Sequence, residues 1–592
     1  MPKVQIEKIN NKSWPAISIL LAFTLLNFLQ AAFLGLLDDE CYYWMYSQFL
    51  DWGYFDHPPA IALMIKWGTL VSKSEWGVRL FSVLAQSLSL VFIWKMVEDP
   101  LSGSVSDSLK ESLKDKMEWA FWLIVLMLPI FQIYGFLATP DAPLFLFSAI
   151  FLFLFKKYLS KDNWVNAFLL GTSMAVLMYS KYHGALVITL AFVVHPKLLK
   201  RPNFYAAVLL SLLLYFPHFF WQFQNEIPSV KYHLVDRIEG FNLLNPLRFI
   251  AEQVLVFNPL FAVLLFPLIF GGHKLGSNSS DFQKSLWSIV IGLFLFFFLS
   301  SFRNRGEAHW VAVASIPLIV LAFQAVLNGE ISKEKLYHLA LPSVLILFAL
   351  RLVLVMGWLN FPPEFYDSND WVSKVEEKAN GLPVLFVNSY QKAAKYEFYT
   401  AQPSMSLNNV AYRKNQYDLW EREQAFQNKE VMICTSTADS GFEKLKGVKE
   451  PTFCRKQKNF RSVQRFETKL IRLFRNESDT HWIVEAELTN PYEQGIPIEH
   501  GRMHLHPTLV VYKGGVVFDH WKMKLMEAWV GDNTIVTEAN LVDLGKTSFR
   551  FSLKSDTPVE LDGFSGVFSF YNDFLPPPIM GRPQMLTNLL DE

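Results

Sequence analysis

Long apolar runs separated by short polar segments fill the first 359 residues, and they restrict the fold more than any other feature. A backbone in lipid must satisfy its own hydrogen bonds, so such runs predict a bundle of membrane-spanning helices. The composition agrees, because 52% of the 592 residues are hydrophobic and only 18% are charged. At about 20 residues per span, we expect about 11 spans, near residues 15–37, 78–97, 118–136, 140–157, 163–179, 184–196, 203–221, 249–270, 285–301, 309–327 and 338–359.

The end of the apolar series divides the chain into three predicted domains, of which residues 1–359 form the membrane bundle. Residues 360–460 mix helical segments, near 371–380 and 389–400, with the apolar strands PVLFVNS and EVMICTS, which indicates a small α/β domain. Residues 461–592 alternate apolar and polar positions in HWIVEAELTN, TLVVYKGG, SFRFSLKS and GVFSFYN, as in an antiparallel β-sandwich. The predicted fold is a polytopic helical bundle followed by a soluble α/β segment and a β-sandwich.

The distribution of Lys and Arg among the connections predicts which side of the membrane each one faces. One set of connections carries 16 of these residues and the opposite set carries nine, so the richer set should be cytoplasmic. An odd number of spans then places residues 361–592 outside. The first apolar run lacks a small-residue cleavage site and is interpreted as a retained helix. We therefore expect a multi-pass protein of the cell inner membrane with its C-terminal domains on the periplasmic side.

Net charge and cysteine usage exclude some functions and leave one question open. The net charge is zero, so no global field favours nucleic acid as a partner. The three cysteines have no metal-ligand spacing. Cys434 and Cys454 both lie in the soluble part, where they could pair in an oxidising compartment or remain separate free thiols. Cys41 follows carboxylates that disfavour a thiolate, so we interpret it as a packing residue.

Polar chemistry concentrates in the predicted outer connections, of which residues 37–79 are the most informative. This connection opens with Asp38, Asp39 and Glu40 beside an apolar helix, where carboxylates are costly to desolvate unless they have a partner or a task. The downstream pattern predicts two interfacial helices, separated by the segment Asp56-His57-Pro58-Pro59. The alternative is an acidic helix cap followed by an aromatic belt.

Four further outer segments add carboxylates, cations and aromatic residues. Asp141 lies at the membrane boundary in ATPDAP, either as a functional acid or as part of a helix cap. Lys181, in SKYHG, could pair with Asp141, hold a phosphate or anchor lipid headgroups. The last two segments contain His233 and Arg237, one helical turn apart, and Arg303, Arg305, His309 and Trp310.

This inventory suits group transfer at the mouth of the bundle. A hydroxyl or amine acceptor needs a carboxylate base within hydrogen-bond reach. A phosphate leaving group needs cations that stabilise its developing charge, and the aromatic residues suit a lipid chain. A lipid-linked sugar flippase or other transporter is the alternative, although the paired internal repeats typical of transporters are not obvious. A third alternative is a noncatalytic scaffold that displays the β-sandwich.

Several blocks of the sequence resemble one family, namely DECYYWMYSQFLDWGYFDHPP, GVRLFSVL, ATPDAPL, SKYHGAL and HWVAVASIPL. They are similar to the ArnT-like, dolichyl-phosphate-mannose–protein mannosyltransferase-like membrane proteins, which are GT-C glycosyltransferases of family 83. The resemblance covers about residues 15–425. It implies a hexosyl or pentosyl transferase that moves a sugar, with inversion, from a polyprenyl-phosphate carrier to a lipid, glycan or protein acceptor. Membrane lipids are the other expected partners.

The resemblance also implies roles for individual residues. Asp39 and Glu40 match the family's Asp-Glu pair, with Asp39 as the base, and Asp141 matches a second acid. Asp56 and His233 match positions that can hold a divalent metal in aminoarabinose transferases, although two ligands do not define a metal. His57 departs from the Lys that those relatives carry. The predicted substrate-binding residues are Tyr54, His57, Lys181, Arg237, Arg303 and His309.

Overall fold

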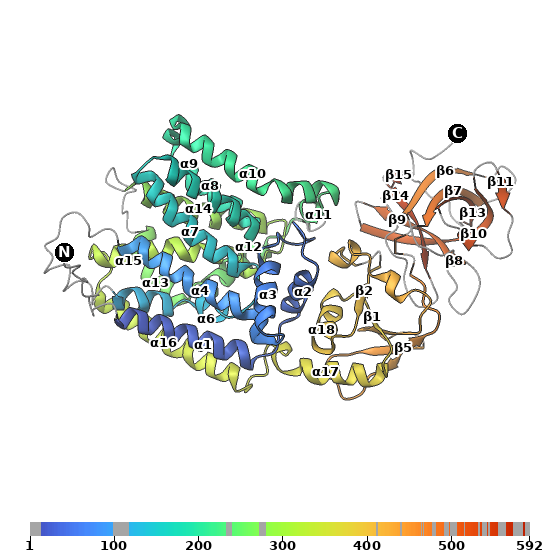
Figure 1. Cartoon of the computed structure of the whole chain (residues 1–592), viewed down its shortest axis with the longest axis horizontal. Coiled ribbons are helices and arrows are strands. Elements are labelled where there is room, and N and C mark those ends of the chain that lie inside the picture. The colour runs from blue at the N-terminus through green and yellow to red at the C-terminus, as the bar shows by residue number, and fades with distance from the viewer. Residues whose placement is uncertain are drawn as a thin grey trace, which may run out of the picture. The chain divides into compact units, whose positions relative to one another are not determined.

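The structure is a computed structural model whose described residues fall into two compact units, Met1–Tyr366 and Asp367–Glu592. Figure 1 shows that helices make up the first unit and that strands predominate in the second. The described residues are 14–98, 118–232, 240–270, 280–409, 412–438, 441–462, 464–465, 467–475, 481–490, 496–497, 506–513, 516–530, 533–535, 541–542, 545–554, 564–571 and 584–585.

The first unit is a helical bundle in which several long helices pack one against the next. α1 (Trp14–Phe33) packs on α4 (Glu75–Glu98), α4 on α7 (Asp141–Ser160), α7 on α8 (Trp164–Ser180), and α8 on α10 (Pro202–Gln224). One buried apolar cluster includes residues from α4, α7, α8 and α10. The other long helices are α9 (His183–Val193), α12 (Leu244–Val256), α13 (Pro259–Phe270), α14 (Asp281–Ser301), α15 (Ser315–Leu327) and α16 (Lys333–Val355). The polytopic helical fold is confirmed.

In the part of the chain that the structure describes, fewer helices than predicted are long and apolar enough to cross a membrane. Among the described residues, seven helices are long and apolar enough to cross a membrane, or up to eight if α12 and α13, bent by 90°, form one span. The expected spans at 163–179 and 184–196 are helices of 17 and 11 residues. The expected span at 118–136 is interrupted at Leu128, because a residue before proline avoids the helical region. Pro129 then starts the short helix α6 (Pro129–Ile133).

The first connection of the bundle contains two helices, as predicted. These are α2 (Asp38–Gln48) and α3 (Ala60–Val71). The loop between them, residues 49–59, packs closely on α10. A Cβ on Gly53 would lie 2.5 Å from the ring of Trp221, so only glycine fits here without displacing that indole. The loop therefore has a defined position on the bundle.

The second unit begins with a mixed α/β sheet. Its strands are β1 (Val384–Val387), β2 (Ser404–Leu407), β3 (Val431–Thr435), β4 (Glu443–Lys444) and β5 (Phe453–Gln457), in the order β2-β1-β3-β5-β4. β1 pairs in parallel with β2 and β3, while β5 is antiparallel to β3 and β4. The helices are α17 (Glu364–Ala379) and α18 (Tyr390–Thr400). PVLFVNS and EVMICTS are the central strands β1 and β3, so both predicted strands are confirmed.

The remaining described strands of the second unit form antiparallel β-structure. One eight-stranded sheet has the order β15-β14-β9-β10-β13-β7-β6, with β11 paired to β10, and β8 pairs separately with β12. β14 also contacts β6 near the other end of this order, so the sheet curls on itself. The four predicted strands are β7 (His481–Asn490), β9 (His506–Lys513), β13 (Gly545–Lys554) and β14 (Phe564–Tyr571). The others are β6 (Glu467–Arg475), β8 (Ile496–Pro497), β10 (Val516–Val530), β11 (Asn533–Ile535), β12 (Leu541–Val542) and β15 (Gln584–Met585).

Candidate active site

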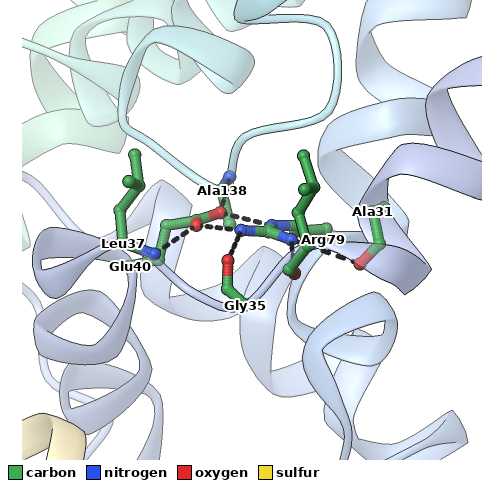
Figure 2. A network of polar contacts seen from close by, with 7 residues as sticks. Ala31, Gly35, Leu37, Glu40, Arg79 and Ala138 are labelled. Atoms are coloured by element: carbon green, nitrogen blue, oxygen red, sulfur yellow. Dashed lines mark hydrogen bonds and ion pairs between the residues drawn. The ribbon is translucent and has the colours of Figure 1, made fainter. Parts of the chain in front are cut away.

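A buried ion pair between Glu40 of α2 and Arg79 of α4 organises one end of the bundle (Figure 2). Nε and Nη2 of Arg79 donate to the two carboxylate oxygens of Glu40 at 2.8 and 2.5 Å. The remaining guanidinium N–H groups donate to the carbonyls of Ala31, Leu34 and Gly35 at the C-terminal end of α1. Both side chains are 0% exposed, and all five donors of Arg79 have acceptors.

Glu40 also accepts two backbone hydrogen bonds. The N–H of Leu37 donates to one carboxylate oxygen at 2.9 Å, and the N–H of Ala138 donates to the other at 2.7 Å. Ala138 stands three residues before Asp141, so Glu40 links the start of α2 to the segment that leads into α7 (Figure 2). Four donors surround the Glu40 carboxylate, which has no exposed surface. These contacts indicate that Glu40 holds its neighbours in position.

A second network surrounds Asp141, the first residue of α7. Nζ of Lys181 lies 2.8 Å from one carboxylate oxygen, and Nε2 of His309 lies 3.5 Å from the other. The Asp141–Lys181 pairing that the sequence allowed is therefore present. The His309 ring packs against Tyr134 with centroids 5.4 Å apart. Asp141 and Lys181 are buried, whereas His309 is partly exposed. Three segments that are far apart in the sequence thus meet at one place.

Asp39 lies next to this network through its neighbour Glu40. The carboxylate of Glu40 accepts from the N–H of Ala138, three residues before Asp141. Asp39 is exposed, whereas Asp141 is buried in its ion pair. The N-terminus of α2, the start of α7, the turn after α8 and the start of the 3-10 helix η5 (Ala308–Ala314) therefore form one candidate site. Of the three predicted acids Asp39, Glu40 and Asp141, Asp39 is the exposed one.

A tyrosine cluster holds Asp56 in the loop between α2 and α3. The hydroxyls of Tyr42 and Tyr46 donate to one Asp56 oxygen at 3.2 and 3.1 Å. Tyr54 stacks on Tyr46 with centroids 4.1 Å apart, and its hydroxyl donates to the backbone carbonyls of Tyr46 and Phe49. Burial raises the pKa of Tyr46 and of Tyr54, so both hydroxyls remain protonated donors. Tyr54 is 0% exposed, and these contacts make it a packing residue of the loop.

Sequence reasoning missed a polar network that joins α10 to this loop. Nδ1 of His218 lies 2.7 Å from the carbonyl oxygen of Trp52, and its Nε2 lies 3.2 Å from the Tyr182 hydroxyl. Nε2 of Gln222 donates to Tyr182 at 2.8 Å and to Ser229, in α11 (Pro228–Lys231), at 2.9 Å. The sequence signal for this network was the polar pair His218 and Gln222, which lie four residues apart on one face of the otherwise apolar helix α10. The network fixes the loop beside the turn that carries Lys181.

The remaining predicted binding residues do not all reach the candidate site. His57 is half-buried and packs against Tyr43 with ring centroids 5.6 Å apart. Arg303 is exposed in the connection between α14 and η5, four residues before Glu307. His233 and Arg237 lie outside the described residues, in the segment 233–239.

The described residues do not provide a ligand set for a metal. No group of three or more His, Cys, Asp or Glu residues in the described ranges could hold a metal ion. Of the predicted pair only Asp56 is described, and one of its oxygens accepts from two tyrosine hydroxyls. His233 lies outside the described residues, so the predicted Asp56–His233 pair stays a prediction.

Comparisons with known proteins support the interpretation of this fold. A family model described as Dolichyl-phosphate-mannose-protein mannosyltransferase matches residues 56–221. Two crystal structures of ArnT from Cupriavidus metallidurans, in the apo state and bound to undecaprenyl phosphate, superpose with a TM-score of 0.56. The match covers 75% and 76% of this chain and 98% and 99% of the two ArnT chains, at 14% identity. The chain has the ArnT-like GT-C fold.

The GT-C match covers nearly all of ArnT but leaves about a quarter of this chain without a counterpart. A curated relative of this GT-C protein is lipid A galacturonosyltransferase RgtD from Rhizobium johnstonii (strain DSM 114642 / LMG 32736 / 3841). It is 24% identical over 296 residues, which are 48% of this chain and 59% of that protein. The chain therefore matches little more than half the length of RgtD.

Proposed function

We propose that this GT-C protein is a membrane glycosyltransferase that moves a sugar from a polyprenyl-phosphate carrier to a cell-envelope acceptor, with inversion and on the periplasmic face. One observation supports the assignment most strongly. Asp39 is exposed beside a site in which the other two predicted acids, Glu40 and Asp141, are buried in ion pairs. The solved ArnT structure that contains undecaprenyl phosphate supports a polyprenyl-phosphate carrier. The name of RgtD supports sugar transfer to an envelope lipid.

In the proposed reaction Asp39 is the general base. It accepts the proton of the acceptor hydroxyl or amine as that nucleophile attacks the anomeric carbon of the donor sugar. The bond from the anomeric carbon to the phosphate oxygen breaks, and its electron pair leaves with polyprenyl phosphate. A single displacement of this kind inverts the anomeric configuration. General-base catalysis of this type contributes about 10²–10⁴-fold.

The neighbouring residues position the base and the acceptor. Glu40 and Arg79 hold the first turn of α2, on which Asp39 stands, against the end of α1. Nζ of Lys181 contacts Asp141 and its side chain is only 5% exposed, so we assign Lys181 to the orientation of Asp141. Asp141 would then align the acceptor next to Asp39. We assign the stabilisation of charge on the donor phosphate to cations nearer the solvent. Among the predicted binding residues, Arg303 is exposed in the part of the chain that the structure describes and could take this role.

A transfer assay tests this proposal and separates it from transport. The purified full chain is incubated with a pool of radiolabelled polyprenyl-phosphate sugars and a cell-envelope acceptor fraction. We expect labelled acceptor and free polyprenyl phosphate in equal amounts, and an anomeric configuration in the product opposite to that of the donor. Retained configuration would contradict the single displacement. Movement of intact donor across reconstituted vesicles without cleavage would show a flippase instead.

A further inference from the structure

Two cysteines of the α/β sheet face each other across neighbouring strands. Cys434 of β3 is the register partner of Cys454 of β5. Their relative exposures are 0% and 1%, so both side chains lie inside the domain. Both are free thiols in this structure. The strand pairing thus brings together residues that are 20 positions apart in the sequence.

The backbone hydrogen bonds of β3 define which kind of cross-strand pair this is. The N–H of Met432 donates to the carbonyl of Pro383 at 2.8 Å, on the β1 side of β3. Backbone groups alternate sides along a strand, so Cys434, two residues later, also directs its N–H and C=O toward β1. Cys434 and Cys454 are therefore a non-hydrogen-bonded pair of the β3–β5 ladder. In such a pair the Cα atoms lie about 4.5 Å apart and the side chains approach each other most closely.

This geometry meets the requirement for a covalent bond between the sulfurs. Disulfides join residues whose Cα atoms are roughly 4.4–6.8 Å apart and whose Cβ atoms point toward each other. A non-hydrogen-bonded antiparallel pair satisfies the distance, and the two side chains lie next to each other on the same face of the sheet. Bond formation needs no shift of strand register.

We infer that Cys434 and Cys454 form a disulfide in the native protein and thereby join β3 to β5. The inference rests on the periplasmic placement in the proposed function, because that compartment provides a disulfide oxidant. The thiolate of one cysteine attacks a sulfur of the oxidant's disulfide, and one thiol of the oxidant leaves. The sulfur of the second cysteine then attacks the mixed disulfide, and the second thiol leaves. Two thiols are oxidised, and two electrons reduce the oxidant to a dithiol.

The two thiols have different surroundings in the folded sheet. The neighbouring Cys434 thiol lowers the pKa of Cys454, and the nearby ammonium group of Lys378 lowers it further. Lys378 pairs at 2.5 Å with Glu443 of β4, which is the register partner of Cys454 on its other side. Burial raises the pKa of Cys434. Because both thiols are inaccessible in the folded sheet, the exchange belongs to folding, before β5 closes on β3.

Thiol trapping in cells tests the inference. Cells that produce the full chain are quenched with acid, and the denatured protein is alkylated before and after reduction and then weighed by mass spectrometry. We expect one alkyl group before reduction, on Cys41, and three after it. In Cys434→Ser, both Cys41 and Cys454 should be alkylated before reduction. Three alkyl groups on the unreduced wild-type chain would overturn the disulfide.

A second measurement distinguishes failure of the disulfide from failure of the periplasmic placement. Ser436 is exposed just beyond β3, so Ser436→Cys, combined with Cys434→Ser and Cys454→Ser, provides a site for a membrane-impermeant maleimide. Labelling of that site in intact spheroplasts, together with a reduced wild-type pair, overturns the disulfide alone. Protection of that site together with a reduced pair overturns both. Labelling together with an oxidised pair supports both.

Discussion

Replacing the neighbouring carboxylates Asp39 and Glu40 by their amides should have different effects. Asp39→Asn should lose transfer activity, and Glu40→Gln should lose stability. Glu40→Gln removes one charge from an ion pair in which both side chains are 0% exposed, and it leaves the guanidinium of Arg79 buried without a carboxylate in this network. Removing one partner of a buried ion pair costs about 3–5 kcal/mol. The main effect of Glu40→Gln is therefore a loss of stability.

The hydrogen bonds of Glu40 give a similar stability cost for Glu40→Gln. Glu40 accepts from Nε and Nη2 of Arg79 and from the backbone N–H groups of Leu37 and Ala138. A glutamine has one acceptor oxygen, and its NH₂ group would face two donors instead. Each buried donor that loses its acceptor costs about 1–3 kcal/mol, so two such losses match the estimate from the ion pair. That amount is a large part of the roughly 5–15 kcal/mol that stabilises a typical domain.

Asp39→Asn should leave the folding intact. Asp39 is exposed, and surface substitutions usually change stability by no more than about 0.5 kcal/mol. Thermal unfolding of the detergent-purified variants, followed by intrinsic fluorescence, should give a wild-type midpoint for Asp39→Asn and a clearly lower one for Glu40→Gln. Adding Arg79→Met to Glu40→Gln should recover part of the loss, because no uncompensated charge then remains. A wild-type midpoint for Glu40→Gln with no transfer activity would refute the positioning role and assign Glu40 to the chemistry.

Three further perturbations test other parts of the structure. Lys181→Met leaves buried Asp141 without its nearest cation and should lower stability by about 3–5 kcal/mol, measured as a lower unfolding midpoint. Gly53→Ala brings a Cβ to 2.5 Å from the Trp221 ring and should lower the midpoint through overpacking that costs about 1–3 kcal/mol. Burial raises the pKa of Asp418, so its contribution to stability is fully present below the unfolded pKa of about 3.9 and is lost as pH rises through the folded value. Unfolding midpoints across that pH range should show this loss.

Matched controls separate these effects from nonspecific damage. Lys231→Met removes a half-exposed lysine at the surface and should leave the midpoint unchanged. Gly240→Ala places a Cβ where no atom lies within 4 Å and should also be neutral. Asp418→Asn should remove the part of the pH dependence that belongs to this carboxyl. An unchanged pH profile in Asp418→Asn would show that another group causes the dependence.

The sequence predicts well the features that depend on local patterns. Apolar runs produced helices, and alternating segments such as 481–490 and 545–554 became strands of one antiparallel sheet. Hydropathy does not show that the described helices on either side of Lys181 have only 17 and 11 residues. Outer segments rich in charge, including Asp39, Asp141 and His309, were found by composition. The structure pairs His309 with Asp141, and Glu40, the neighbour of Asp39, contacts the segment that leads into α7.

Apart from the Asp141–Lys181 pair, the long-range partners of the site residues could not be predicted from the sequence. Arg79 was counted only as an outer positive charge, yet it is the partner of Glu40, 39 residues away. The other contact of Glu40, with the backbone of Ala138, spans 98 residues and leaves no trace in composition or periodicity. The contact between His218 of α10 and the carbonyl of Trp52 likewise depends on how α10 packs on the loop. Such pairs follow from the tertiary packing of helices.

We propose Asp39 as the base of a polyprenyl-phosphate-dependent sugar transfer. The most direct measurement compares sugar-transfer rate and polyprenyl-phosphate binding in the same preparations of wild type, Asp39→Asn and Glu330→Gln. Glu330 is an exposed carboxylate between α15 and α16, at the end of α15 away from His309, and serves as the control. We expect Asp39→Asn to lose at least about 10²-fold in rate with unchanged lipid binding, and Glu330→Gln to match wild type. Transfer by Asp39→Asn at the wild-type rate would contradict the account.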